Sequence, residues 1–437
     1  MIHVTARDPT ILSAKGLAMR QVLASSSALL LGMLLLMIGN GLQGSVLGVR
    51  GGLEGFSTFA LSIVMSGYFL GFLGGSQITP HLIRRVGHVR VFAALGSFIS
   101  AALIIFPTLT DPVVWTILRV VLGFCFSGVY VTAESWLNNS TTNEMRGKTL
   151  SAYMIVQMVG MVIAQGILSL GDPSGYILFI VPSVLVSISF APILLSVSPT
   201  PPYETSKPMT LRRLFAVSPL GCVGMFLMGG VFAAQMGMAS VYAIQAGFTL
   251  PEVSIFIAAI FIGAVVFQLP IGWISDRVDR RLVILGAAAV GGIACLLGSL
   301  VGTHLYIAIG VALLAGGMAT PLYSLLIAHT NDYLDPDDMA GSSGGLIFIN
   351  GVGAVGGPVI AGWLMGVFGP SGYWLLQAVL LLSIVAYAAW RMTRRAATPV
   401  DETAAYVAVM PSTTPIASEV AQEWAIEQAE EDAEEFE

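Results

Sequence analysis

The stretch Gly272-Trp-Ile-Ser-Asp-Arg-Val-Asp-Arg-Arg281 lies between two long apolar segments of the chain. A second basic stretch, Arg84-Arg-Val-Gly-His-Val-Arg90, lies 192 residues earlier when Arg85 is aligned with Arg277. We call residues 84–90 the first hinge and residues 272–281 the second hinge. Each hinge is flanked by apolar segments long enough to cross a membrane. Two such hinges half a chain apart predict a membrane unit that is built twice.

The amino-acid composition places most of the chain in a lipid bilayer. Hydrophobic residues make up 56% of the sequence and charged residues only 10%, with a mean hydropathy of +0.84. Soluble domains carry about 25% charged residues. The net charge of −6 is unevenly distributed, because residues 401–437 hold 11 acids and no Lys or Arg. Residues 1–400 therefore carry 19 basic and 14 acidic residues, which predicts a basic membrane body with an acidic tail.

Twelve apolar segments predict an all-α integral membrane protein with two six-helix halves. Each segment is long enough, at about 1.5 Å per residue, to cross a hydrocarbon layer of about 30 Å. The predicted domains are a cytoplasmic N-terminal segment (1–21), an N-terminal bundle (22–197), a cytoplasmic linker (198–216), a C-terminal bundle (217–391) and a flexible acidic cytoplasmic tail (392–437). The predicted spans are 22–49, 57–83, 88–108, 112–138, 146–170, 175–197, 217–246, 251–275, 281–303, 304–330, 340–369 and 370–391.

The basic residues predict the orientation of the chain in the membrane. With the N-terminus placed inside, every Lys and Arg except Arg50 and Arg119 falls in a cytoplasmic segment or at a cytoplasmic helix end. We therefore expect a multi-pass protein of the inner (plasma) membrane with both termini in the cytoplasm.

A second pair of landmarks supports the duplication. Residues 130–138 begin with Tyr130 and have a counterpart in residues 323–331, which begin with Tyr323, at an offset of 193 residues. The hinges have nearly the same offset. Paired membrane halves of this kind are typical of transporters, and their substrate site usually lies near the bilayer midplane between the halves.

Several segments resemble the major facilitator superfamily (MFS). The second hinge, GWISDRVDRR, resembles the superfamily's cytoplasmic signature between helices 2 and 3 and between helices 8 and 9. The stretch from Arg119 through Gly123 to Gly128 resembles its fourth-helix motif. The resemblance covers about residues 22–391 and implies the twelve-helix MFS fold, with pseudo-two-fold related halves and transport activity. Three segments more narrowly resemble the YcaD-like bacterial branch, namely ITPHLIRRVGHVR (78–90), VTAESWLNN (131–139) and RGKTLSAYMIVQMVG (146–160).

The two hinges differ in the residues that this resemblance associates with gating. In the family, the hinge Asp and Arg hold the inner gate closed, and Asp276 and Arg277 match them in the second hinge. In the first hinge, Arg84 replaces the usual Asp and Pro80 replaces the leading Gly. We therefore expect an asymmetric gate. The alternative is that the basic residues only anchor loops at the cytoplasmic surface. The remaining gating candidates are Arg85, Arg280 and Arg281.

Arg119 is the basic residue predicted to lie inside a span. It follows Pro112 by seven residues, which places it about 10 Å from the external end of its helix. Glu134, fifteen residues further along the same helix, is about 22 Å away and cannot pair with it. An Arg at membrane depth usually faces a partner or a water-filled cavity. We therefore expect Arg119 to bind an anionic group of the substrate or to take part in coupling. The alternative is that it pairs with polar groups of neighbouring helices or extends to the external interface.

Glu134 is the acidic residue predicted to lie well inside a span, near its cytoplasmic end. A carboxylate in an apolar setting binds a proton more readily and can carry a coupling proton. The alternative is an interfacial Glu that pairs with Arg146 or Lys148 in the next loop.

Further polar residues are candidates for the wall of a central cavity. In the family, helices 1, 4, 7 and 10 line the path, and most of these residues lie on them. The alternative for each is a hydrogen bond between helices. They are Asn40, Gln43, Tyr130, Gln157, Gln235, Tyr242, Tyr323 and Asn350.

The leading functional hypothesis is a secondary active transporter that moves a small solute by alternating access, coupled to an ion (proton) gradient. No phosphate-binding Gly-x4-Gly-Lys-Ser/Thr loop is present, so ATP hydrolysis is not expected. No acid pair, metal-ligand set or activated nucleophile gathers at one depth, so we expect no enzyme activity, cofactor or metal. The alternative is a transporter-like receptor that signals through its acidic tail. Expected partners are a small-molecule substrate, anionic if Arg119 binds it, and membrane lipid, with no nucleic acid. We expect a monomer.

Overall fold

The computed structural model describes residues 27–140, 143–194 and 209–395, together with residues 399, 403, 406–411 and 414. All regular secondary structure in this part of the chain is helical. The first half contains α2 (Ser27–Leu53), α3 (Thr58–Val86), α4 (His88–Ile105), α5 (Pro112–Ser140), α6 (Asn143–Leu170) and α7 (Ile177–Leu194). The second half contains α9 (Pro219–Gln245), α10 (Leu250–Ser275), α11 (Arg280–Val301), α12 (Leu305–Asn331), α13 (Pro336–Phe368) and α14 (Ser371–Met392).

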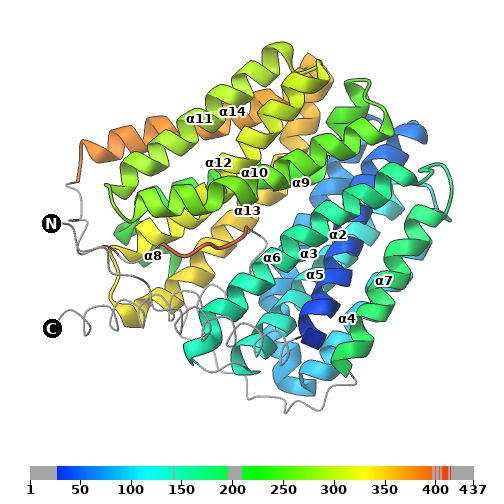
Figure 1. Cartoon of the computed structure of the whole chain (residues 1–437), viewed down its shortest axis with the longest axis horizontal. Coiled ribbons are helices and arrows are strands. Elements are labelled where there is room, and N and C mark those ends of the chain that lie inside the picture. Colours follow the sequence, from blue (N-terminus) through cyan, green and yellow to red (C-terminus); the bar gives the residue numbers. More distant parts are fainter. Residues whose placement is uncertain are drawn as a thin grey trace, which may run out of the picture.

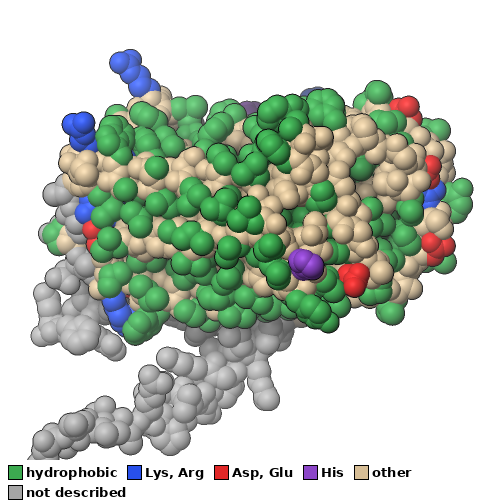
Figure 2. Space-filling view, turned by 90° about the horizontal axis from the view of Figure 1, so that it is seen from above, with side chains coloured by type: hydrophobic (Ala, Val, Ile, Leu, Met, Phe, Trp, Pro, Cys, Tyr) green, Lys and Arg blue, Asp and Glu red, His purple; other side chains and the backbone are tan. Residues whose placement is uncertain are grey.

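The predicted all-α membrane fold is confirmed. Among the described residues, 11 helices are long and apolar enough to cross a membrane, and Ile177–Ala191 of α7 forms a shorter apolar helix. Residues Leu211–Val217, at the end of the predicted linker, form an additional short helix, α8. Figure 1 shows the helices of the two halves as two neighbouring groups. On the face shown in Figure 2, charged side chains gather toward the two ends, with many apolar side chains between them.

Glycines allow the same close helix packing in both halves. A Cβ on Gly71 or on Gly123 would lie 1.9 Å from a backbone carbonyl oxygen of the opposite helix, where α3 meets α5. In the second half, a Cβ on Gly263 or on Gly316 would lie 2.0 or 2.3 Å from a carbonyl oxygen, where α10 meets α12. The two pairs are offset by 192 and 193 residues. Small residues let membrane helices approach this closely, so the duplication extends to the packing of the helix backbones.

The two hinges form tight turns at one end of the molecule, which we call the hinge end. Gly87 ends α3 with φ 87°, a conformation that glycine adopts without steric cost. In the second hinge, Asp279 precedes α11, and its Oδ1 accepts a hydrogen bond from the N–H of Arg281 at 3.0 Å. A side-chain acceptor at this position satisfies a free N–H of the first helical turn.

The two halves touch directly toward the end opposite the hinges. A Cβ on Gly48 of α2 would lie 2.0 Å from Oγ of Ser240 in α9. Between α3 and α13, the hydroxyl of Ser66 donates to the carbonyl oxygen of Val355 at 2.5 Å. The structure therefore has close contacts between the halves away from the hinge end.

At the hinge end, a segment of the C-terminal tail lies between the halves. Residues 406–411 have no regular secondary structure and follow an extended course between the two groups of helices (Figure 1, red). The side chains of Val409 and Met410 are buried, and so is that of Thr414. The sequence predicted a flexible tail here, whereas the structure packs these described residues against the membrane bundles.

Candidate functional site

A central cavity lies between the two halves. Its wall combines side chains of α2, α3, α5 and α6 with side chains of α9, α10 and α13. Seven of the residues that the sequence singled out line it: Asn40, Gln43, Arg119, Tyr130 and Gln157 from the first half, and Gln235 and Asn350 from the second. Residues from both halves therefore meet at one site, as expected for a substrate site between duplicated bundles.

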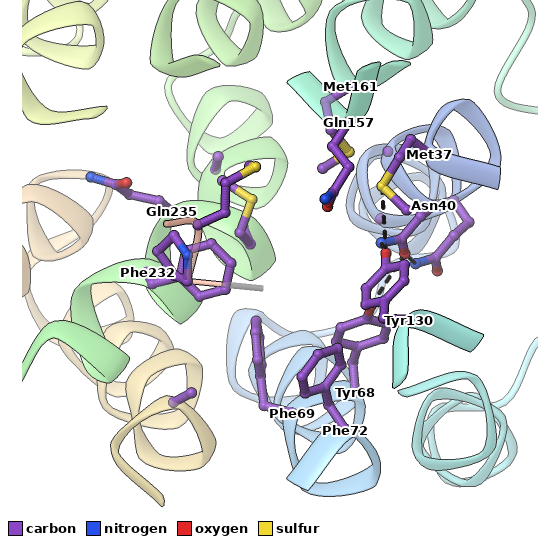
Figure 3. Close-up of a pocket in the computed structure, with 18 of the residues that line it drawn as sticks. Met37, Asn40, Tyr68, Phe69, Phe72, Tyr130, Gln157, Met161, Phe232 and Gln235 are labelled. Carbon is purple, nitrogen blue, oxygen red and sulfur yellow. Dashed lines mark hydrogen bonds between the residues drawn. The ribbon is translucent and has the colours of Figure 1, made fainter. Parts of the chain in front are cut away.

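A hydrogen-bonded network covers the first-half side of the cavity (Figure 3). Arg119 donates from Nη1 to Oε1 of Gln43 at 2.7 Å, and Gln43 donates in turn to Oδ1 of Asn40 at 3.1 Å. The amide of Asn40 donates to the Tyr130 hydroxyl at 2.7 Å. The hydroxyl of Tyr68 also donates to Asn40, at 3.3 Å. The network fixes the side chains that surround the Arg119 guanidinium.

Arg119 is a buried cation without an acidic partner in the described part of the chain. Its residue surface is only 3% exposed, and its guanidinium carbon lies 4.6 Å from the centre of the Tyr68 ring. None of the ion pairs formed by the described residues involves Arg119, and its Nε makes no hydrogen bond to them. A cation–π contact and one neutral hydrogen bond only partly compensate a charge removed from water. The cavity therefore presents an incompletely paired positive charge.

The second-half side of the cavity is less polar. Gln235 donates to Oε1 of Gln377 at 3.0 Å, and Asn350 donates to the carbonyl oxygen of Met225 at 3.0 Å. Both amides are thus held by the protein itself. Aromatic rings contribute much of the remaining wall, with Phe69 and Phe72 on α3 and Phe232 on α9 (Figure 3). The cavity combines one cation and several amides with an apolar aromatic surface.

Three candidates from the sequence lie outside the cavity wall. Glu134 is 3% exposed, accepts a hydrogen bond from the Tyr153 hydroxyl at 3.0 Å, and accepts another from the N–H of Thr414 at 3.1 Å. Tyr242 is buried in an aromatic cluster, with its ring centroid 4.7 Å from that of Tyr373. Tyr323 is completely buried, and its hydroxyl has no hydrogen-bond partner among the residues described. These three side chains therefore cannot touch a molecule held inside the cavity without rearrangement.

The gating candidates gather at the second hinge. Arg280 is 2% exposed and pairs with Asp332 at 2.5 Å, while Asp276 lies 3.8 Å from its other terminal nitrogen. Arg281 pairs with Asp279 at 2.7 Å. Burial alone would raise the pKa of Asp279, but the hydrogen bonds from Arg281 leave this pKa below its ordinary value.

The other two gating candidates are exposed. Arg277 lies over its neighbour Trp273, with the guanidinium carbon 4.2 Å from the ring centre. Arg85 of the first hinge is exposed at the end of α3. The two hinges therefore differ in structure, because the second forms buried ion pairs and the first presents its Arg84 and Arg85 side chains at the surface.

Sequence reasoning missed several cavity residues. Tyr68 completes the polar network and faces Arg119, and its signal was an aromatic spacing with Phe72 on one helix face. Gln165 lines the cavity and accepts a hydrogen bond from Ser45 at 3.1 Å. Met410 and Pro411 of the tail also line it, and nothing in the local sequence marks them as part of a membrane cavity.

Comparison with known proteins identifies the family. The family model of the Major Facilitator Superfamily matches residues 29–259 and 220–418. An uncharacterized MFS-type transporter, YfkF of Bacillus subtilis (strain 168), is 26% identical over 327 residues, which cover 73% of this chain and 83% of YfkF. YcaD of Escherichia fergusonii, also an uncharacterized MFS-type transporter, is 25% identical over 319 residues, which cover 71% of this chain and 81% of YcaD.

A solved structure agrees on the fold. The crystal structure of the nucleoside transporter NupG superimposes with a TM-score of 0.68 at 13% identity, covering 84% of this chain and 99% of NupG. At that identity the comparison shows the fold alone. Together with the match of the family model to both halves, it establishes that this multi-pass membrane protein belongs to the Major Facilitator Superfamily and is a membrane transporter of its YcaD-like branch.

Proposed function

We propose that this transporter is a secondary active carrier that moves a small organic anion by alternating access, driven by a proton gradient. The observation that carries the choice of an anion is the buried guanidinium of Arg119, which lines the cavity without a described carboxylate partner. A substrate carboxylate, sulfonate or phosphate would supply the missing charge. Arg forms two parallel hydrogen bonds with such planar or tetrahedral anions.

The rest of the cavity wall constrains the body of the substrate. Phe69, Phe72 and Phe232 offer apolar aromatic surface opposite and beside the polar network. Pockets of this type bind ligands through apolar contact and use a few polar groups to fix orientation. We therefore expect an amphipathic anion with an aromatic or aliphatic body rather than a fully hydrated inorganic ion.

Alternating access is supported by the uneven contacts between the halves. Toward the end opposite the hinges, α2 meets α9 at Gly48 and α3 meets α13 at Ser66. At the hinge end, the extended segment 406–411 lies between the halves.

We further propose that the hinge end faces the cytoplasm of the inner membrane, that both termini lie there, and that the protein acts as a monomer. The positive charge of the hinges supports this orientation. A receptor role is not favoured, since the curated relatives are transporters.

The decisive experiment is a transport assay with the purified protein in liposomes. Radiolabelled aromatic carboxylates and sulfonates are compared with lipophilic cations and sugars, each with and without an imposed pH gradient. We expect uptake of at least one organic anion that is saturable and accelerated by the gradient. Uptake of a cation and of no anion would contradict the role assigned to Arg119.

Glu134 is the residue proposed to carry the coupling proton. Its side chain lies on α5 and is buried between Tyr153 of α6 and Thr414 of the tail. The Glu134→Gln variant keeps the size and one acceptor oxygen but cannot exchange a proton. We expect it to catalyse exchange of labelled for unlabelled anion within about threefold of the parent rate, while accumulation against a gradient is lost. A variant that still accumulates the anion in response to the pH gradient would exclude Glu134 as the coupling site.

A further inference from the structure

The backbone of the C-terminal segment 406–411 makes hydrogen bonds with side chains of the second half. The N–H of Tyr406 donates to Oδ1 of Asp276 at 2.9 Å. Ser324 of α12 exchanges two hydrogen bonds with Val409, because its hydroxyl donates to the carbonyl oxygen of Val409 at 2.9 Å and accepts from the N–H at 2.9 Å. Side chains of the second hinge and of α12 thus hold the backbone of an extended peptide by hydrogen bonds.

Thr414, three residues after this segment, is bonded to the first half. Thr414 donates from both its N–H and its hydroxyl to Oε2 of Glu134 in α5, and its side chain is 1% exposed. Hydrogen bonds to an ionised carboxylate are stronger than neutral ones. The described tail residues therefore connect the two bundles, with Asp276 and Ser324 on one side and Glu134 on the other.

The surface that receives the tail is shaped for it. A Cβ on Gly272 would lie 2.5 Å from Cδ1 of Tyr406, so the ring lies directly against the glycine of the second hinge. Val409 is 2% exposed and packs in the continuous hydrophobic core. Met410 and Pro411 form part of the wall of the central cavity. Residues 409–411 are therefore buried in the protein and fill space next to the candidate substrate site.

We infer that residues 406–411, together with Thr414, form a plug that closes the hinge-end mouth of the central cavity and must leave before a solute can pass through that end. Hydrogen bonds to both halves also hold the halves in one relative position. The bound tail therefore blocks translocation in two ways. It closes the cavity, and it prevents the rocking of the halves that alternating access needs. The regulatory consequence rests on the proposed transport function, whereas the closure of the cavity does not.

Closure is tested by the accessibility of a cysteine in the cavity, which requires no substrate. Ser76 lines the cavity on α3, and Ser76→Cys is introduced after the buried cysteines Cys125, Cys222 and Cys295 are replaced by Ala. A hydrophilic maleimide is applied to the purified protein in detergent. We expect deletion of residues 400–437 to accelerate labelling by at least about tenfold, since the plug then no longer limits the open fraction.

A matched truncation separates the plug from the acidic end of the tail. A chain that ends at Ser418 keeps residues 406–414 but loses nine of the 11 acids of the tail, leaving only Asp401 and Glu402. We expect this chain to be labelled as slowly as the full-length protein. Equal labelling rates for the full-length chain and the 400–437 deletion would overturn the inference.

A cross-link in the full-length chain covers the case in which the deletion does not fold. Tyr406→Cys is paired with Gly272→Cys in the background without native cysteines, because a Cβ on Gly272 would lie 3.3 Å from Cγ of Tyr406 and the two side chains are thus close enough for a disulfide. Oxidation should join the two peptides, as detected by mass spectrometry, and should stop anion exchange until a reductant is added. Failure of the pair to cross-link would show that the tail is not bound there. If the pair cross-links but the reduced protein transports no anion, the proposed function is wrong while the inference of a plug still holds.

Discussion

The Arg119→Gln variant is expected to lose uptake of the organic anion by at least about 30-fold, because removing one partner of a buried charge pair costs about 2–5 kcal/mol of binding free energy. The amide of the new side chain can still donate to Oε1 of Gln43, which accepts from the Arg119 guanidinium in the parent protein. The network around the cavity should therefore survive while the charge is lost. Uptake kinetics in liposomes measure the effect, with thermal unfolding as the check on folding.

Two companion variants separate charge from geometry. Arg119→Lys keeps the charge but loses the planar donor set and the stacking on Tyr68, so we expect an intermediate loss of about tenfold. Arg90→Gln removes an exposed cation from the first hinge and should leave uptake within about twofold of the parent. A purely structural role for Arg119 predicts a different pattern, in which Arg119→Gln lowers the unfolding temperature and leaves the uptake of the remaining folded protein unchanged.

The Gly71→Ala variant is expected to lose much stability although the change adds only one methyl group. Its new Cβ would lie 1.9 Å from the carbonyl oxygen of Val120 and 2.8 Å from the amide nitrogen of Phe124, so α3 and α5 must separate. Overpacking costs about 1–3 kcal/mol or more, and here the obstacle is backbone. We expect the free energy of unfolding to fall by about 3 kcal/mol. Because the Tm shift is inversely proportional to the unfolding entropy, Tm of a chain of 437 residues should fall by about 3 °C. Thermal unfolding in detergent, followed by circular dichroism, measures both.

Gly74→Ala on the same helix is the matched control. A Cβ on Gly74 meets nothing within 4 Å, and Ala stabilises a helix by about 0.5–1 kcal/mol relative to Gly. Its Tm should be unchanged or slightly higher. If both variants unfolded at the same temperature as the parent protein, the inference that α3 and α5 are too close for a side chain at Gly71 would be wrong.

Much of the fold could be predicted because it depends on periodic and local properties. The apolar spans, the two hinges and their shared offset follow from hydropathy and charge along the chain. The depth of Arg119 also follows, since the rise per residue in a helix is constant. The duplicated glycine pairs at 71 and 263 and at 123 and 316 were present in the sequence, but they became meaningful only when the structure showed α3 against α5 and α10 against α12.

The candidate site could be predicted less well from the sequence, because hydropathy does not determine how each helix is rotated about its axis. Tyr130 and Tyr323 occupy equivalent places in the two halves, yet Tyr130 lines the cavity and Tyr323 does not. Tyr242 lies on a helix that contributes to the wall but points into the aromatic cluster with Tyr373 and Trp374. A single apolar helix carries too weak an amphipathic pattern to distinguish a cavity-facing side from a side that packs against another helix.

The sequence by itself determined the class of protein, the duplication and the presence of an intramembrane cation, because these are properties of composition and of spacing along the chain. Only the tertiary structure decided which polar side chains share the cavity with Arg119, and that Met410 and Pro411 of the tail contribute to its wall. Tyr406 and Val409 lie more than 80 residues from Ser324 and Asp276. Contacts over such separations depend on how two bundles are placed relative to each other, and no local propensity of an irregular apolar segment such as residues 406–411 encodes that placement.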